Sequence, residues 1–203
     1  HQSEQAIAAV AVFRTLEGLV IAFFSGFANA ATILVGKEVG AGNHEAAFER
    51  AKRLVYLRSG FIGIACLTLV GIHNPLLHAM GLKEESYRIG TGMLLIYSVA
   101  ALFRMGNWAQ NDTYRSAGDA AFGSIMEITF MYLLVLPCVY GINYGLHGPF
   151  LLVFACCYVD EPIRYLIMQR HMYSAKWIKP VSTEGMAAIG EFRRKHGLRE
   201  RRK

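Results

Sequence analysis

Long runs of apolar residues constrain this chain more than any other feature of its sequence. They predict five helices, at about residues 6–36, 44–72, 87–110, 125–144 and 149–169. An α-helix needs about 20 mostly apolar residues to cross the hydrocarbon core of a bilayer, and these runs reach or approach that length. Only 18% of the residues are charged, which is below the roughly 25% typical of soluble domains. The sequence therefore predicts an all-α, polytopic membrane protein.

The basic residues are concentrated near the C-terminus. Eleven of the 21 Lys and Arg residues lie from Arg164 onward, and seven of these from Arg193. Cations that flank a membrane span favour the cytoplasmic side and anionic lipid, so they indicate a membrane anchor and not a nucleic-acid site. We expect residues 1–180 to form the membrane part and residues 181–203 a basic, mobile cytoplasmic tail. With five crossings, the N-terminal end then lies outside.

Few charged residues interrupt the apolar runs. Arg14 and Glu17 lie three residues apart, on the same face of the first predicted helix. Two interpretations stay open: they line a central cavity, where charges are commonly functional, or they neutralise each other near the outer interface. Arg58 lies close enough to the start of its apolar run to extend toward the headgroups. In the fifth run, the spacing of three charged residues predicts a local salt-bridged cluster: Asp160, Glu161 and Arg164.

No motif indicates an enzyme or a metal site. The four cysteines lie inside apolar runs without metal-ligand spacing, and His73 and His78 have no carboxylate at ligand spacing. The sequence has no Gly-x-Ser-x-Gly and no His-Glu-x-x-His motif. We predict no catalytic residue, no metal and no cofactor.

Three glycines separate the first apolar helix from the charged helix that follows: Gly36, Gly40 and Gly42. They lack the Gly-Lys-Ser/Thr ending of a phosphate-binding loop, and no strand precedes them. A helix C-terminus followed by a tight reversal explains them better. We expect a turn at residues 37–43.

Three parts of the sequence resemble the multidrug and toxic compound extrusion (MATE) family. Residues 26–53, GFANAATILVGKEVGAGNHEAAFERAKR, resemble the second helix of a half-repeat with its Val-Gly-x-x-x-Gly-Ala-Gly turn. Residues 107–122, NWAQNDTYRSAGDAAF, are similar to a segment that runs from an Asn to Arg-x-Gly-Gly-Asp-Thr-x-Phe, with Ala117 and Ala120 replacing the first Gly and the Thr. Short segments further on resemble the DNA-damage-inducible-protein-F-like branch: Leu133–Pro137, Asp160–Glu161 and Ala175–Ile178.

The resemblance implies a transporter of two lobes with six helices each. This chain would be a fragment, the C-terminal lobe without its first helix, and its partners would be the missing N-terminal lobe and the lipid bilayer. The family relation implies export of small organic compounds, cationic ones among them, across the cell membrane, with H⁺ or Na⁺ as the coupling ion. Two alternatives stay open: a lipid-linked-oligosaccharide flippase of related architecture, and an inactive truncated membrane fragment.

The resemblance also suggests roles for single residues. Asn107 matches a cavity position of the family and is a candidate for the substrate or ion pathway. Glu17, Arg14 and Asp112 are further pathway candidates, although the family has a small residue where Asp112 stands. The remaining matches would be structural residues of the cytoplasmic turns: Gly36, Gly40, Gly42, Arg115, Gly118 and Asp119.

Overall fold

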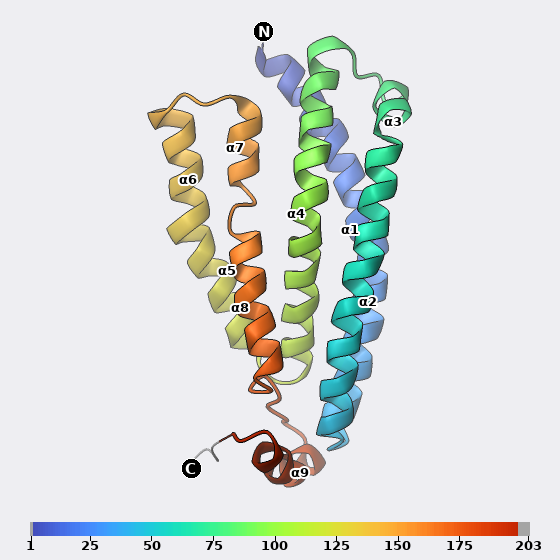
Figure 1. Cartoon of the computed structure of the whole chain (residues 1–203), viewed down its shortest axis with the longest axis vertical. Helices are drawn as coiled ribbons and strands as arrows, with labels where there is room; N and C mark the ends of the chain where they lie inside the picture. The colour runs from blue at the N-terminus through green and yellow to red at the C-terminus, as the bar shows by residue number, and fades with distance from the viewer. Residues whose placement is uncertain (1, 199–203) are drawn as a thin grey trace.

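The structure, a computed structural model, describes residues 2–198, apart from the side chains of Gln2, Ser3, Phe23, Phe27, Ala28 and Ala31. Residues 2–198 form helices joined by short turns, and this part of the chain contains no strand (Figure 1). The α-helices are α1 (Gln2–Gly40), α2 (His44–Gly71), α3 (His73–Ala79), α4 (Glu84–Ser116), α5 (Ala120–Phe130), α6 (Leu136–Tyr140), α7 (Phe150–Cys156), α8 (Glu161–Tyr173) and α9 (Thr183–Lys195). The π-helical turn η1 (Met131–Val135) joins α5 to α6, and a second one, η2 (Gly141–Gly145), continues α6, so that the four form one continuous stretch.

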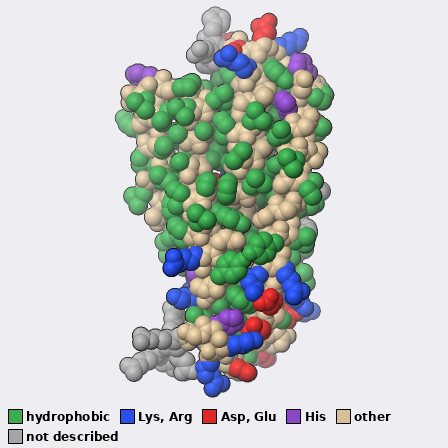
Figure 2. Space-filling view, viewed as in Figure 1, with side chains coloured by type: hydrophobic (Ala, Val, Ile, Leu, Met, Phe, Trp, Pro, Cys, Tyr) green, Lys and Arg blue, Asp and Glu red, His purple; other side chains and the backbone are tan. Residues whose placement is uncertain are grey.

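The described residues include four helical stretches that are long and apolar enough to cross a membrane: Glu4–Gly26, His44–Gly71, Glu84–Ser116 and Ala120–Gly145. The fifth predicted helix, 149–169, is not continuous, because α7 and α8 follow each other in line with a turn between them (Figure 1). The start of α1 and helix α9 lie at opposite ends of the bundle (Figure 1). Apolar side chains cover the middle of the visible face and charged ones gather at its ends (Figure 2). The chain is an all-α, multi-pass membrane protein.

Helix α4 occupies the centre of the bundle, where it contacts α1, α2, α5, α7 and α8. Small residues let its neighbours approach closely, as is common where membrane helices pack. At Gly106, for example, an added Cβ atom would lie 2.6 Å from the ring of Tyr165 on α8. The buried polar residues of α4, among them Asn107 and Gln110, face other helices and not lipid. By contrast, α5–η2 lies at the edge of the bundle with most of its apolar side chains exposed.

The turn between α1 and α2 is shorter than predicted. Gly36 and Gly40 lie inside α1, and only Gly42, with φ +81°, belongs to the reversal. Gly36 serves close packing instead, because an added Cβ atom would lie 3.3 Å from Cβ of Ser116 on α4. The prediction of a loop at Gly36 and Gly40 was wrong, since α1 continues to Gly40; at Gly36 the glycine is explained by the helix that packs close to it.

Other helix boundaries also differ from the predicted ones. Helix α4 continues to Ser116, so Arg115 lies in its last turn, and the turn before α5 comprises only residues 117–119. Part of the polar link after α2 forms α3. Arg58 does not extend to the headgroups as predicted, because its side chain is buried within the bundle with 1% exposed.

The predicted mobile tail contains a helix, α9, which lies across the end of the bundle (Figure 1). Ser182 caps it: the Ser182 hydroxyl accepts a hydrogen bond from the amide of Gly185 (3.1 Å) and donates one to the carbonyl of Gly40 (2.6 Å). These bonds give the segment fixed partners on α1. Residues 199–203 of the predicted tail lie outside the described residues.

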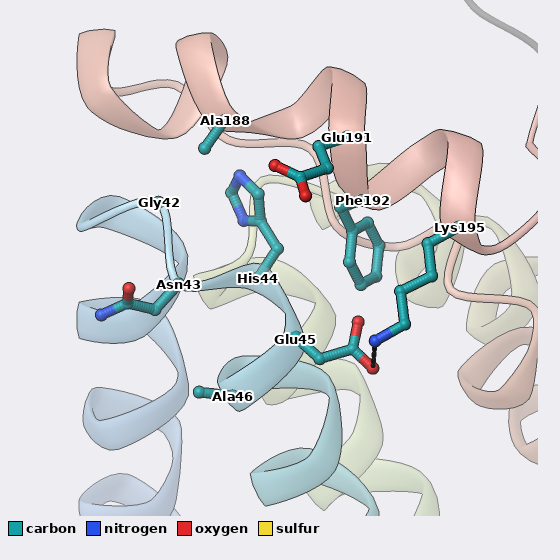
Figure 3. Close-up of a pocket in the computed structure, with 9 residues that line it drawn as sticks. All are labelled: Gly42, Asn43, His44, Glu45, Ala46, Ala188, Glu191, Phe192 and Lys195. Carbon is teal, nitrogen blue, oxygen red and sulfur yellow. Dashed lines mark ion pairs between the residues drawn. The ribbon is translucent and has the colours of Figure 1, made fainter.

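The contact between α9 and the α1–α2 turn is drawn in Figure 3. Nε2 of His44 donates to the carbonyl of Gly185 (2.8 Å), and Lys195 pairs with Glu45 (3.2 Å). Gly42 permits the close approach, since an added Cβ atom would lie 3.2 Å from Cβ of Ala188. This shallow hollow of about 370 Å³ holds none of the predicted pathway residues. It is a docking contact within the chain.

Candidate functional site

The break between α7 and α8 places backbone and charged side chains inside the bundle. Residues 157–160 form tight turns, in which the amides of Cys157, Tyr158 and Val159 donate to the carbonyl three residues earlier, such as Cys157 N to Phe154 O (3.2 Å). Helix α8 then starts at Glu161, and Pro162 occupies its first turn, where a missing N–H leaves no bond unmade. Figure 1 shows this break part-way along the bundle, away from both ends. A broken helix at membrane depth is tolerated where protein or a cavity surrounds it.

Charged side chains from three helices meet at this break. Nη1 of Arg104, on α4, lies 3.4 Å from Glu17 on α1, and its Nε lies 4.0 Å from Glu161. Arg164 pairs with Glu161 (2.8 Å) and with Asp160 (3.3 Å). We call these five residues and Asn107 the charge network: Glu17, Arg104, Asn107, Asp160, Glu161 and Arg164.

Asn107 links α4 to the start of α8. Its Nδ2 donates to the backbone carbonyl of Glu161 (3.0 Å) and to the Glu161 carboxylate (2.7 Å). Among the described residues, Oδ1 of Asn107 and Nε of Arg164 are buried without a hydrogen-bond partner. Both residues line a cavity of about 10 Å³ together with Asn111 and Glu127, a volume that suits one water molecule. The network therefore has unused hydrogen-bonding capacity at a wettable position.

The charge network is costly in free energy, because its carboxylates are buried and outnumber its guanidinium groups. Glu17 is 3% exposed and Glu161 and Asp160 are each 4% exposed. Three carboxylates face two guanidinium groups, which leaves one negative charge inside the network. Arg14 reaches Glu17 from the surface (2.9 Å) with a side chain that is 71% exposed. Charged groups at such depth are expensive and are commonly functional.

Aromatic rings cover one side of the network. The Arg104 guanidinium lies 5.1 Å from the ring centroid of Trp108 and 5.4 Å from that of Tyr158. Tyr158 packs edge-on against Tyr97, which does the same with Phe13. Cation–π contacts of this kind hold an arginine in place while leaving its N–H groups free for carboxylates. Arg104 is thus positioned between Glu17 and Glu161.

The structure brings together three of the four predicted pathway candidates. Arg14, Glu17 and Asn107 belong to or touch the network. Asp112 does not: it is half-exposed further along α4, where its carboxylate lies 4.0 Å from the guanidinium of Arg115. The pairing of Arg14 with Glu17 does occur, but Glu17 also has a partly buried partner on another helix, Arg104.

Sequence reasoning missed Arg104 and the long-range role of Glu161. The local pairs predicted for Asp160, Glu161 and Arg164 are present, but Glu161 also binds Asn107 and faces Arg104, both on α4. The signal that could have found them is an acidic pair that interrupts an apolar run before a proline. Such an interruption predicts a broken helix and a buried polar site.

The predicted structural residues Gly118 and Asp119 form a second cluster, between α4 and α5. Asp119 is buried and pairs with Nζ of Lys179 (2.6 Å) and Nε2 of His171 (2.9 Å). The amide of Lys179 donates to the carbonyl of Ala117 (2.8 Å). These contacts fasten the segment after α8 to the α4–α5 turn. The cluster is separate from the charge network, and its bonds hold two parts of the chain together.

Comparison with known proteins places these features in context. A family model described as MatE matches residues 1–140. The chain is 27% identical over 190 residues to the uncharacterized transporter YisQ of Bacillus subtilis (strain 168), covering 90% of this chain and 39% of that protein. It is 26% identical over 195 residues to multidrug and toxin extrusion protein 1 of Danio rerio, covering 93% of this chain and 32% of that protein. The chain thus spans less than half the length of these relatives. No solved structure matches it.

Proposed function

Since this chain belongs to the MatE family, we propose that it is one lobe of a membrane exporter that exchanges H⁺ or Na⁺ for small organic compounds, cationic ones among them. The relatives' names, a transporter and a multidrug and toxin extrusion protein, support transport. The branch within the family stays a prediction. A second lobe would complete the substrate cavity, because five crossings supply one wall of it. We place the protein in the cell membrane with its basic C-terminus in the cytoplasm, in keeping with the positive-inside rule.

The charge network is the observation that carries this proposal. Transporters commonly bind coupling ions where a helix is interrupted near the middle of the membrane. Here the interruption between α7 and α8 brings Glu161 toward Arg104, which also reaches Glu17. The third cation that balances the three carboxylates is Arg14, which is 71% exposed, so solvent weakens its pair with Glu17 and a proton or a monovalent cation could take its place.

Arg104 supplies a way for binding to change the arrangement. Its contacts with Glu17 (3.4 Å) and Glu161 (4.0 Å) are both longer than an optimal ion pair. When a proton or Na⁺ neutralises Glu17, Arg104 is left to pair with Glu161 at the start of α8. When Glu17 releases the proton or Na⁺, its carboxylate is negatively charged again and draws Arg104 back toward α1. The occupancy of Glu17 would in this way be coupled to the position of the broken helix.

Replacing Glu17 with glutamine tests this role. We expect Glu17→Gln to lower ion-driven efflux of a fluorescent dye by about tenfold or more, a loss of about 1.4 kcal/mol or more of coupling. The measurement is dye efflux from proteoliposomes that contain the whole protein carrying this chain, with an imposed H⁺ or Na⁺ gradient.

Glu85→Gln is the matched control, because Glu85 is a partly exposed carboxylate on α4 outside the network that pairs with Arg88 on the same helix (3.0 Å). It should leave efflux nearly unchanged. Unchanged efflux in Glu17→Gln would remove Glu17 from the mechanism, and equal losses in both variants would point to a general loss of membrane-buried charge.

A further inference from the structure

A basic pocket lies where α8 leaves the bundle and the end of α9 turns back toward it. Its volume is about 570 Å³. Side chains from three parts of the chain line it: the last turn of α8, the connection to α9 and the end of α9. Its lining includes His171, Lys176, Ile178, Lys179, Arg193 and Leu198.

The charge of this pocket is positive. None of the described residues that line it is acidic. Lys179 pairs with Asp119 at 2.6 Å, which neutralises one cation. The other two cations of the lining, Lys176 and Arg193, form no ion pair within residues 2–198. Two positive charges therefore remain available to a ligand.

Capping of helix ends does not account for these cations. The last carbonyls of α8 already accept hydrogen bonds: Arg170 O from the amide of Ser174 (3.1 Å) and Met172 O from Nε1 of Trp177 (2.9 Å). At the end of α9, Arg193 O accepts from the amide of Leu198 (2.9 Å). These three carbonyls therefore do not need a basic side chain to cap them. An anion from outside is the better partner for Lys176 and Arg193.

The surface next to the pocket is apolar and faces outward. Ile163 and Ile167 of α8, which precede the lining residue His171 at intervals of four residues, are 46% and 36% exposed. Exposed apolar side chains on a membrane-crossing helix contact acyl chains, whereas cations just beyond its end attract phosphate groups. Figure 2 shows Lys and Arg side chains below the apolar band on this side of the molecule. A ligand with a phosphate and acyl chains would satisfy both surfaces.

From these observations we propose that the pocket between α8 and α9 binds the phosphate headgroup of an anionic phospholipid. Lys176 and Arg193 hold the phosphate, and the acyl chains lie along the exposed face of α8. The bound lipid would join α9 to the last crossing. This site lies apart from the charge network and does not depend on transport activity.

The test is lipid binding by the purified protein in a neutral detergent. Dioctanoyl phosphatidylglycerol should raise the temperature of unfolding in a saturable way, because a ligand that binds only the folded state stabilises it. Dioctanoyl phosphatidylcholine and inorganic phosphate at the same concentrations should not. The double variant Lys176→Gln/Arg193→Gln should need about 30-fold more phosphatidylglycerol for half of the effect.

The matched control is Lys37→Gln/Arg194→Gln, which removes two exposed cations from the same end of the molecule outside the pocket. It should behave as the unaltered protein. Equal weakening in both double variants would show general electrostatic attraction and overturn the site. A full effect of inorganic phosphate would assign the pocket to free phosphate and overturn the lipid. Native mass spectrometry of the unaltered protein gives an independent readout, in which a tightly held anionic lipid is expected and its complete absence after adding phosphatidylglycerol contradicts the proposal.

Discussion

Glu161→Gln is expected to lower the free energy of unfolding by about 3 kcal/mol, which is the scale for removing one partner of a buried ion pair. Glu161 pairs with Arg164 at 2.8 Å and accepts from Asn107 at 2.7 Å. Without its carboxylate, Arg164 keeps only the longer pair with Asp160, and Arg104 loses one of two carboxylates. The glutamine has nearly the same shape, so the effect reports charge and not packing. The measurement is unfolding in mixed detergent micelles, followed by circular dichroism.

Two further variants test whether the charge network is the cause. Glu85→Gln removes a partly exposed carboxylate whose ion-pair partner, Arg88, is 80% exposed, and should change the free energy of unfolding by no more than about 0.5 kcal/mol. In Asp160→Asn/Glu161→Gln/Arg164→Gln the guanidinium and its second carboxylate are also removed, so no charge of this local cluster is left without its partner and we expect this variant to recover part of the loss. If Glu161→Gln unfolds like the unaltered protein, the buried charges do not stabilise this fold.

The helices could be predicted because the length of an apolar run is tied to the thickness of the bilayer. The predictions of turns and helix breaks were wrong where the same residue fits two different local structures. Gly36 fits a turn and also fits a close contact with Ser116, and only the packing of α1 on α4 decides between them. Pro162 and the acidic pair before it signalled a helix start inside the fifth run. That signal was read as a local charge cluster within one helix.

The charge network shows the limit of sequence reasoning more clearly. Glu17 and Asn107 could be found, the first as a charge inside an apolar run and the second by family resemblance. Their partners could not, because Arg104 lies 87 residues from Glu17 and Glu161 lies 54 residues from Asn107. Such contacts depend on which helix faces meet. Periodicity within one helix does not specify that.

Helix α9 was missed for a different reason. Its charge composition resembles a disordered tail, but Met186, Ile189 and Phe192 recur at intervals of three residues behind the cap Ser182. Phe192 is buried against Phe48 and His44. The amphipathic signal was present, and the density of Lys and Arg concealed it.

Gly118→Ala is expected to destabilise the protein by about 3 kcal/mol, because backbone strain and a steric collision act together at one position. Gly118 has φ +91°, a conformation that residues with a side chain rarely adopt. An added Cβ atom would also lie 2.0 Å from the carbonyl oxygen of Lys179. The Lys179 segment would have to move away, which breaks its hydrogen bond to Ala117 and strains its ion pair with Asp119.

Gly81→Ala separates the two causes. Gly81 has φ +80°, nearly the same backbone conformation, but nothing lies within 4 Å of an added Cβ atom. It should therefore cost only the left-handed strain, about 1–2 kcal/mol. Hydrogen exchange at the Lys179 amide gives a second readout, since exchange should quicken in Gly118→Ala and stay unchanged in Gly81→Ala. Equal destabilisation by the two variants, with Lys179 protected in both, would mean that the α4–α5 turn does not hold the segment leading to α9.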